Sequence, residues 1–146
     1  MTATEANPVT IARALTQATR AVVDAAVKQG AVTTKNGATI DDHQVLTERL
    51  AYLATQIRAA EDLVAYAERV PADEMQGRFA LAYAAEVAHA TRSQIEAGWD
   101  DFGLTVADIA PLETAEARAS IRRGLSEEAI RAIGRQMIST GGVNNC

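Results

Sequence analysis

Apolar residues recur at intervals of three and four positions along most of the chain, which is the spacing of one face of an α-helix. The first such segment begins at Asn7 and Pro8, an N-cap residue followed by the residue best suited to the first helical turn. Gly30 is expected to end this helix as a left-handed cap, and the pair Asn36-Gly37 marks a turn in the polar stretch that follows. Because no segment of any length alternates apolar and polar residues as a β-strand does, the pattern predicts an all-α protein.

A second helix is expected to start at Asp41 or Asp42, with Gln44 three residues after Asp41 as in a capping box. Its apolar line consists of Val45 or Leu46, then Leu50, Leu53, Ile57, Ala60, Val64 and Ala67. The line is unbroken until Pro71, which disfavours helical geometry in the residue before it. We therefore expect a long helix that ends at Val70.

Three more helices follow in the pattern. The third runs from near Asp73 to Gly98, a short one covers residues 112–123 and ends at Gly124, and the last one opens at Ser126. The expected inner side of the last helix is formed by Ile130, Ile133, Met137 and Ile138.

A single domain accounts for the chain, since 146 residues are enough to bury a substantial core. We expect an up-and-down four-helix bundle, with four to five helices, over residues 7–140. Residues 1–6 are expected to be a flexible N-terminus and residues 141–146 a flexible end or a truncated linker. The Ala-rich composition, poor in aromatic residues, favours helices that pack closely.

Charge and cysteine content limit the cellular locations and the classes of binding partner that we expect. The net charge is −5 and no cluster of Lys and Arg is interleaved with aromatic residues, so we expect no nucleic-acid partner. No apolar run approaches the ~20 residues that span a bilayer, and the N-terminal residues lack the pattern of a signal peptide, so no membrane contact is expected. The single cysteine, Cys146, cannot form an internal disulfide; we expect a cytoplasmic location and an inert thiol.

Few residues carry recognisable chemistry. His43 and His89 lie on different expected helices and have no metal-ligating neighbour at helical spacing, while Glu48 and Glu86 lack a second pair. The chain has no glycine-rich phosphate loop and no nucleophile elbow. We therefore expect no catalytic residue and no metal site.

The segment Ala97–Thr105, which reads AGWDDFGLT, is the most unusual stretch of the chain. It places the only tryptophan and one of the two phenylalanines beside the adjacent carboxylates of Asp100 and Asp101, just after a long helix. Such a pair could ligate a metal, take part in acid–base chemistry or simply face water. The expectation is a solvated helix end.

Four segments resemble the C-terminal helical domain of the acyl-CoA dehydrogenases. His43–Ile57 resembles the family segment F-Q-x-x-x-x-x-L-A-x-M-A-x-x-I, which forms a central helix of that four-helix domain. Asn36–Ile40 falls where the family reads F-G-x-P-I, Ala84–Ala88 resembles A-x-E-x-A, and Trp99–Thr105 falls in register on F-G-G-Y-G-Y-T. Taken in this order and spacing, the resemblance covers residues 8–140.

The resemblance implies that most flavin-contacting positions have changed. Thr33 stands where the family has an arginine that contacts the FAD pyrophosphate across the dimer, and Asn36 replaces the aromatic residue beside the flavin. Asp100 and Asp101 replace a Gly-Gly pair that lets the backbone approach the nucleotide. Because their charge would repel phosphates and their side chains would fill the space, we expect no cofactor in this chain.

Two flavin-contacting residues of the family, Gln44 and Gly103, remain. The position of the family's common catalytic glutamate falls on Gly124, although some branches carry their base on an earlier helix. The chain is too short to include the large domains that hold flavin and acyl-CoA in the family, so we expect that it is not a complete enzyme by itself.

The resemblance also suggests a place for such a chain. One branch of the family, the (2S)-methylsuccinyl-CoA dehydrogenases, carries an extra N-terminal helical region, and this chain is similar to such an extension. The implied function is non-catalytic packing against an FAD-containing dehydrogenase body or within a homo-oligomer. The alternative is a partner subunit of a split acyl-CoA dehydrogenase that completes an FAD site in another chain, and a third interpretation is a bundle that binds an unrelated small molecule.

Aromatic side chains are the expected interface residues. Trp99 and Phe102 are the first candidates, and Tyr52 and Tyr83 are secondary ones, because buried aromatic residues commonly anchor interfaces. The alternative, equally compatible with the sequence, is that these residues fill the core of the bundle itself.

Overall fold

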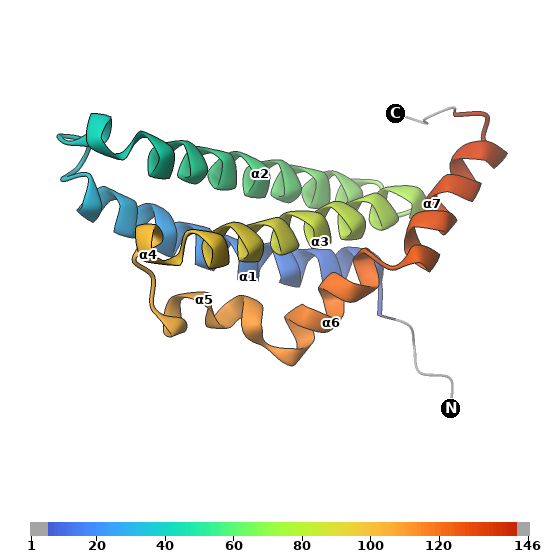
Figure 1. Ribbon diagram of the computed structural model, residues 1–146. Coiled ribbons are helices and arrows are strands. Elements are labelled where there is room, and N and C mark those ends of the chain that lie inside the picture. Colours follow the sequence, from blue (N-terminus) through green and yellow to red (C-terminus); the bar gives the residue numbers. More distant parts are fainter. Residues whose placement is uncertain (1–5, 143–146) are drawn as a thin grey trace.

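The computed structural model describes residues 6–142, and within that range it contains helices and no β-strand (Figure 1). The all-α prediction is confirmed. The elements are α1 (Pro8–Thr33), η1 (a 3₁₀ helix, Ile40–His43), α2 (Gln44–Arg69), α3 (Glu74–Ala97), α4 (Trp99–Phe102), α5 (Val106–Glu113), α6 (Ala115–Gly124) and α7 (Glu127–Ser139). In this part of the chain, no helix is both long and apolar enough to cross a bilayer.

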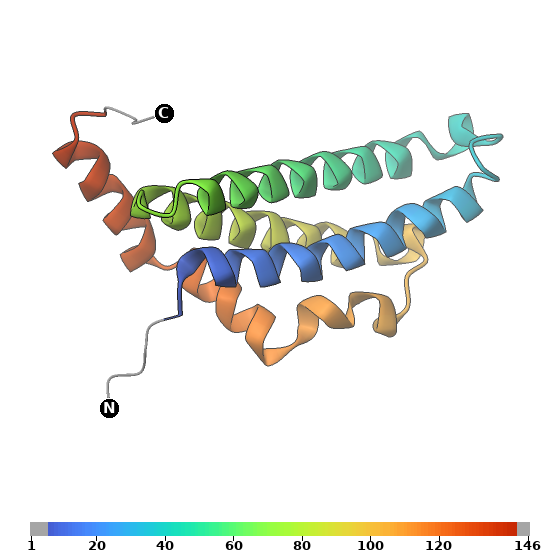
Figure 2. The same ribbon diagram turned by 180° about the vertical axis from the view of Figure 1, so that it is seen from behind.

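The three long helices α1, α2 and α3 lie side by side, each antiparallel to the one before it (Figures 1 and 2). They share one core, whose largest fully buried side chains include Leu15 and Val22 of α1, Leu53 and Ile57 of α2, and Ile95 of α3. Since burying one such side chain contributes roughly 1.5–3 kcal/mol, this core is the main source of stability.

The helices α5 and α6 cover one side of α1 and α3 (Figures 1 and 2). Leu112 of α5 and Ile121 of α6 enter the common core. At the end of α6, a Cβ atom on Gly124 would lie 2.5 Å from Cβ of Ala85 and 2.8 Å from the carbonyl oxygen of Leu81. Only glycine therefore allows α6 to approach α3 as closely as it does.

Three predicted helix starts are confirmed by their caps. The side chain of Asn7 accepts a hydrogen bond from the backbone N–H of Val9 at 2.9 Å. Asp73 caps α3 and Ser126 caps α7 in the same manner. The expected ends of α2 and α3 are confirmed as well, because α2 stops before the Val70-Pro71 pair and α3 stops at Ala97.

The connection between α1 and α2 differs from the prediction. Gly30 is not a C-cap: α1 continues to Thr33, and Gly30 is buried where its missing side chain makes room for Leu50. The left-handed residues come later, at Lys35, Asn36 and Gly37, in the predicted turn.

The start of α2 was also predicted incorrectly. Asp41 and Asp42 lie inside η1, and the residue before α2, His43, makes no side-chain cap. The capping box expected between Asp41 and Gln44 is therefore absent, because the 3₁₀ turn places both carboxylates before the helix begins.

The short helix expected over residues 112–123 is observed as α6, and an additional helix that was not predicted, α5, precedes it. A capping box opens α5: Thr105 accepts from the backbone N–H of Asp108, and Asp108 accepts from the backbone N–H of Thr105 at 2.7 Å. The hydrogen bonds that Thr105 donates to this carboxylate, from its backbone N–H and from its hydroxyl, lower the pKa of Asp108. Thr114 then caps α6, so both N-cap signals were present in the sequence.

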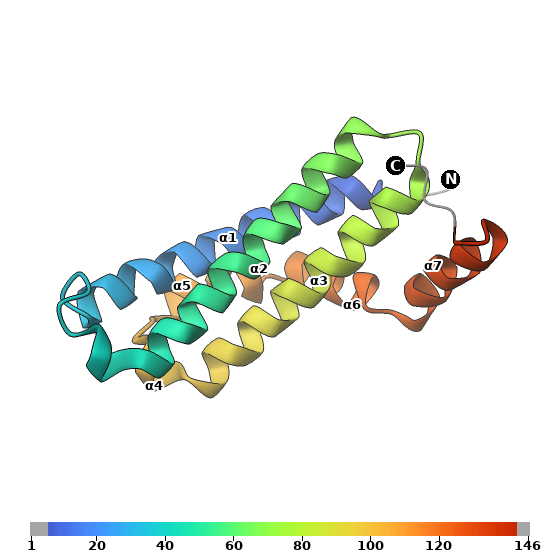
Figure 3. The same cartoon turned by 90° about the horizontal axis from the view of Figure 1, so that it is seen from above.

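The last helix was expected to bury one side, and this prediction is wrong. No residue of α7 is buried, and the exposed fractions of Ile130, Met137 and Ile138 are 51%, 39% and 83%. The helix contacts α3 and α6 near its start and then points away from the three long helices (Figures 1 and 3).

Candidate functional site

The positions that the sequence resemblance aligned with flavin contacts gather at one end of the bundle. The connection between α1 and α2 carries Thr33, Asn36 and Gln44, and the corner between α3 and α4 lies near the same end (Figures 1 and 3). A Cβ atom on Gly103, at the end of α4, would lie 3.4 Å from the side-chain amide nitrogen of Gln29 in α1. The fold thus brings together two segments that the sequence separates widely.

Two glycines shape the corner between α3 and α4. Gly98 follows the last residue of α3, and a Cβ atom there would lie 2.6 Å from Nη1 of Arg49. Gly103 has a φ of 62° and donates its backbone N–H to the carbonyl oxygen of Trp99, which closes the single turn of α4. The corner is therefore held by backbone geometry and by a guanidinium group from α2 that crosses it.

Both carboxylates of the corner are exposed. Asp100 and Asp101 lie in the first turn of α4, and Oδ2 of Asp101 is 3.6 Å from Nη1 of Arg49. Arg49 is the one residue of this corner that sequence reasoning missed, because no local signal indicates which side chain of α2 will lie over Gly98. The arrangement is that of a solvated helix end with one weak ion pair.

The other positions of this end engage in local contacts. Thr33 donates its hydroxyl to the carbonyl oxygen of Gln29 at 3.1 Å, as expected for a threonine in the last turn of a helix. Asn36 and Gln44 are exposed. None of these three residues carries a positive charge that would offset the charge of a pyrophosphate.

The four aromatic candidates fall into three environments. Phe102 is 1% exposed and fills the core of the bundle, as the alternative to an interface role predicted. Trp99 and Tyr83 are partly buried and pack against the core. Tyr52 is 60% exposed on α2.

A cavity of 360 Å³ opens beside Trp99, between α1, α3 and α5. Its lining combines apolar and charged side chains: Val22, Ile95, Ile109 and Leu112 with Arg92, Glu96, Glu113 and Arg118. Arg92 donates to Oε1 of Glu113 at 2.8 Å and Arg118 donates to Oε2. The hydrogen bond from Arg118, assisted by Arg92, lowers the pKa of Glu113, so this carboxylate links α3, α5 and α6 and is a poor proton acceptor.

A larger groove of 1080 Å³ lies at the opposite end, between the starts of α1 and α3, the end of α2, and α7. Its charged lining residues carry both signs: Arg13, Arg78 and Arg123 with Glu68, Asp73, Glu74 and Glu128. Arg13 is paired with Glu68 across the groove wall. The groove therefore offers no field of one sign that would select a charged ligand.

The candidate residues for metal or acid–base chemistry are dispersed over the structure. His43 precedes α2, while His89, Glu48 and Glu86 are exposed on α3 and α2. Across residues 6–142, no group of three or more His, Cys, Asp or Glu side chains is placed to hold a metal ion. Cys146 and the greater part of the two expected flexible ends lie outside the described residues.

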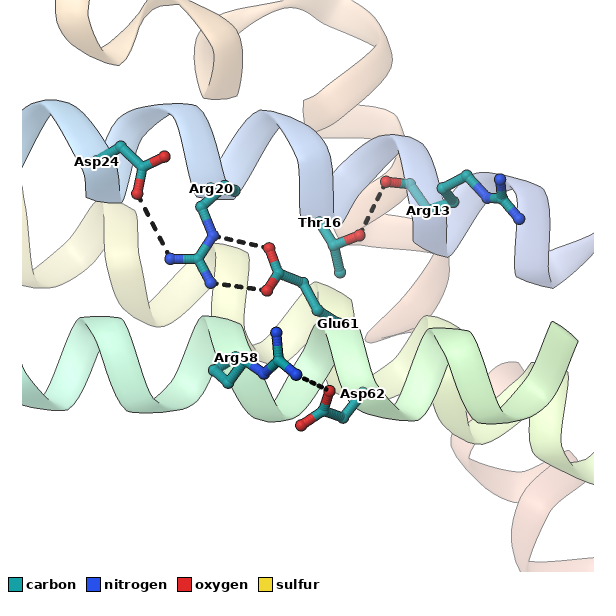
Figure 4. Close-up of polar contacts among 7 residues, drawn as sticks. All are labelled: Arg13, Thr16, Arg20, Asp24, Arg58, Glu61 and Asp62. Atoms are coloured by element: carbon teal, nitrogen blue, oxygen red, sulfur yellow. Dashed lines mark hydrogen bonds and ion pairs between the residues drawn. The ribbon is translucent and has the colours of Figure 1, made fainter. Parts of the chain in front are cut away.

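A charge contact made at two points joins α1 to α2. Arg20 donates from Nε and Nη2 to the two carboxylate oxygens of Glu61, both at 2.7 Å, while its Nη1 lies 3.4 Å from Asp24 (Figure 4). The hydrogen bonds lower the pKa of Glu61 and raise that of Arg20. This two-point contact fixes the register of the two helices and leaves no open position for a substrate.

Comparisons with protein-family models, with curated proteins and with solved structures give no match.

Proposed function

We propose that this chain is a non-catalytic helical domain of an acyl-CoA dehydrogenase-like flavoprotein, which packs against the catalytic body or within an oligomer in the cytoplasm. Its closest functional counterpart would be the N-terminal extension of a (2S)-methylsuccinyl-CoA dehydrogenase. FAD would then belong to the catalytic body and not to this domain. In fold terms, α1, α2 and α3 would be three members of an up-and-down four-helix bundle, with α5 and α6 together as the fourth.

The main support for this proposal is the negative charge at the corner between α3 and α4. A flavin nucleotide on the equivalent surface would bring its pyrophosphate to the two exposed carboxylates of Asp100 and Asp101. Arg49 offsets only one of them, at 3.6 Å from Asp101. Repulsion between like charges, together with the bulk of two side chains where bare backbone is needed, opposes nucleotide binding.

The position of the family's common catalytic base supports the same conclusion. Position 124 is occupied by glycine, and even a Cβ atom there would meet Ala85 and the backbone of Leu81. A glutamate would have to displace α6 from α3. The packing of α6 therefore leaves no room for a base at that position.

Flavin binding tests the proposal directly. The purified chain is mixed with excess FAD, passed through a desalting column and examined for the visible absorbance of bound flavin. We expect none with the natural chain. The variant in which Asp100→Gly and Asp101→Gly are combined shows how much of the exclusion is due to these two side chains.

A second arm adds the catalytic body of a methylsuccinyl-CoA dehydrogenase as a separate chain. Co-elution of this chain with that body, with the flavin content of the body unchanged, supports a packing domain. Flavin retained by this chain alone contradicts the proposal. Flavin that appears only after two flavin-free chains are mixed supports a split dehydrogenase instead.

A further inference from the structure

Helix α7 has an apolar face that the described part of the chain does not cover. Ile130, Ile133, Gly134 and Met137 are spaced by three and four residues, so they share one side of the helix. None of them is buried, and the flank of α7 that faces the long helices borders the open groove of 1080 Å³. A helix of 13 residues has little stability in water without packing, so this face calls for a covering surface.

Gly134, the glycine on this face of α7, indicates what kind of surface could cover the face. A Cβ atom on Gly134 would have no heavy atom within 4 Å, so nothing in the described part of the chain requires glycine there. Glycine in the interior of an exposed helix is unfavourable relative to alanine. It is, however, the residue that allows the backbone of a second helix to approach closely, as Gly124 does for α6 on α3.

The charges on α7 indicate the direction of that second helix. Glu127 and Glu128 occupy the first turn, and Arg131 and Arg135 follow, so the helix runs from acidic to basic. Two parallel copies would place like charges level with one another. Two antiparallel copies oppose acidic and basic ends and also align the helix dipoles favourably.

We infer that α7 is a self-association site, in which the α7 helices of two copies of this chain pair antiparallel through the face of Ile130, Ile133, Gly134 and Met137. The pair has twofold symmetry, so the same patch serves both copies. This inference deepens the proposed packing function by naming its surface and its occupant. If the domain docks on a dehydrogenase body through another surface, that docking does not depend on the pairing of α7 helices.

Sedimentation velocity over a range of concentrations tests the pairing. The natural chain is expected to shift from the 15.5 kDa mass of a monomer to twice that mass as the concentration rises. The variant in which Ile130→Lys and Met137→Lys are combined is expected to weaken dimerisation at least tenfold. Both side chains are exposed in the single chain, so circular dichroism should show an unchanged helical fold.

Ser139→Lys is the matched control. Ser139 is exposed and lies nine residues after Ile130, two and a half helical turns on, which places it on the side of α7 opposite Ile130. It should leave the dimer intact. Gly134→Ala should weaken the dimer without lowering the stability of the monomer, because a methyl group there meets only the second copy.

Disulfide formation between single cysteines tests the direction. In a Cys146→Ser background, cysteines placed one at a time at positions 130, 133, 134 and 137 should cross-link best at one position near the middle of the face and less at its two ends. Equal cross-linking at all four positions would indicate parallel helices and overturn the antiparallel arrangement. A chain that stays monomeric at all concentrations, or a dimer that ignores every α7 variant, overturns the inference while the flavin and co-elution tests of the proposed function still apply.

Discussion

The body formed by α1, α2 and α3 and the last helix α7 are built from similar amphipathic segments, yet they differ in what covers them. Ile57 in the body is 0% exposed, whereas Ile130 of α7 is 51% exposed. The charges differ in the same way, since Glu61 holds Arg20 of another helix at two points, while Arg131 pairs within α7 with Glu127. Apolar periodicity therefore predicts that a helix face will be covered, but only the fold shows whether the same chain covers it.

The largest loss of stability should come from a substitution that removes atoms from the shared core. Ile57→Ala is expected to lower the free energy of unfolding by about 2–5 kcal/mol, because it removes buried methylene groups and leaves a cavity. Ile138→Ala, on the exposed side of α7, should stay within about 0.5 kcal/mol. Urea denaturation of both variants measures the difference, and similar losses would contradict the division into a covered body and an uncovered helix.

The same substitution at two glycines should have opposite signs. Gly124→Ala is expected to cost about 1–3 kcal/mol, because the new methyl group meets Ala85 and the backbone of Leu81. Gly134→Ala should stabilise the monomer by up to about 1 kcal/mol, because its Cβ lies in open space and alanine is the better helix former. Thermal unfolding at a concentration low enough to keep the chain monomeric distinguishes the two, and equal signs would refute the assigned environments.

Acidification should weaken the contact between α1 and α2. The hydrogen bonds from Arg20 lower the pKa of Glu61 in the folded state below its usual value of 4.5, so the unfolded state binds a proton more readily. The stabilisation is therefore complete above pH 4.5 and is lost as the pH falls through the lowered pKa. Glu61→Gln should remove about 1 kcal/mol near neutral pH and flatten this part of the pH profile.

Asp62→Asn is the control for that experiment. Asp62 is one residue away and pairs with Arg58 on the same helix, with both side chains mostly exposed. It should change the free energy of unfolding by less than about 0.5 kcal/mol. If Asp62→Asn cost as much as Glu61→Gln, the two-point contact between helices would not be the source of the effect.

The smallest effect is expected at the acidic corner. Asp101→Asn removes an exposed pair with Arg49 whose atoms are 3.6 Å apart, so the loss should be about 0–0.5 kcal/mol and should vanish at high salt. A larger loss in thermal unfolding would mean that Asp101 supports the corner more strongly than a solvated helix end should.

Local chemistry explains which parts of the fold the sequence could predict. Asn7, Asp73 and Ser126 were correctly placed as caps, because a cap depends on a backbone N–H only two or three residues away. Gly30 was misjudged as a helix end because it makes room for Leu50, a residue distant in sequence. Gly124 was correctly placed at the end of its helix, but its close contact with Ala85 was not predicted. A helix end and a close helix contact both select glycine, and the sequence alone does not distinguish them.

In the candidate site, too, local features could be predicted from the sequence and long-range contacts could not. The exposure of Asp100 and Asp101 followed from two carboxylates in one short turn, whereas Arg49 lies over Gly98 only because α2 and α3 pack in one particular register. Phe102 and Trp99 are three residues apart in the same corner, yet one is fully buried and the other only partly. Trp99 borders a cavity that α5 helps to line, and the capping box of α5 is present in the sequence although α5 was not predicted as a separate helix.

Trp99 is the chain's single tryptophan, and it borders the cavity between α1, α3 and α5, far from α7 (Figure 1). Its fluorescence emission therefore reports on one end of the molecule only, while far-ultraviolet dichroism averages every helix. If α7 melts before the body does, a heating curve followed by dichroism will begin to fall while the tryptophan spectrum is still that of the native protein.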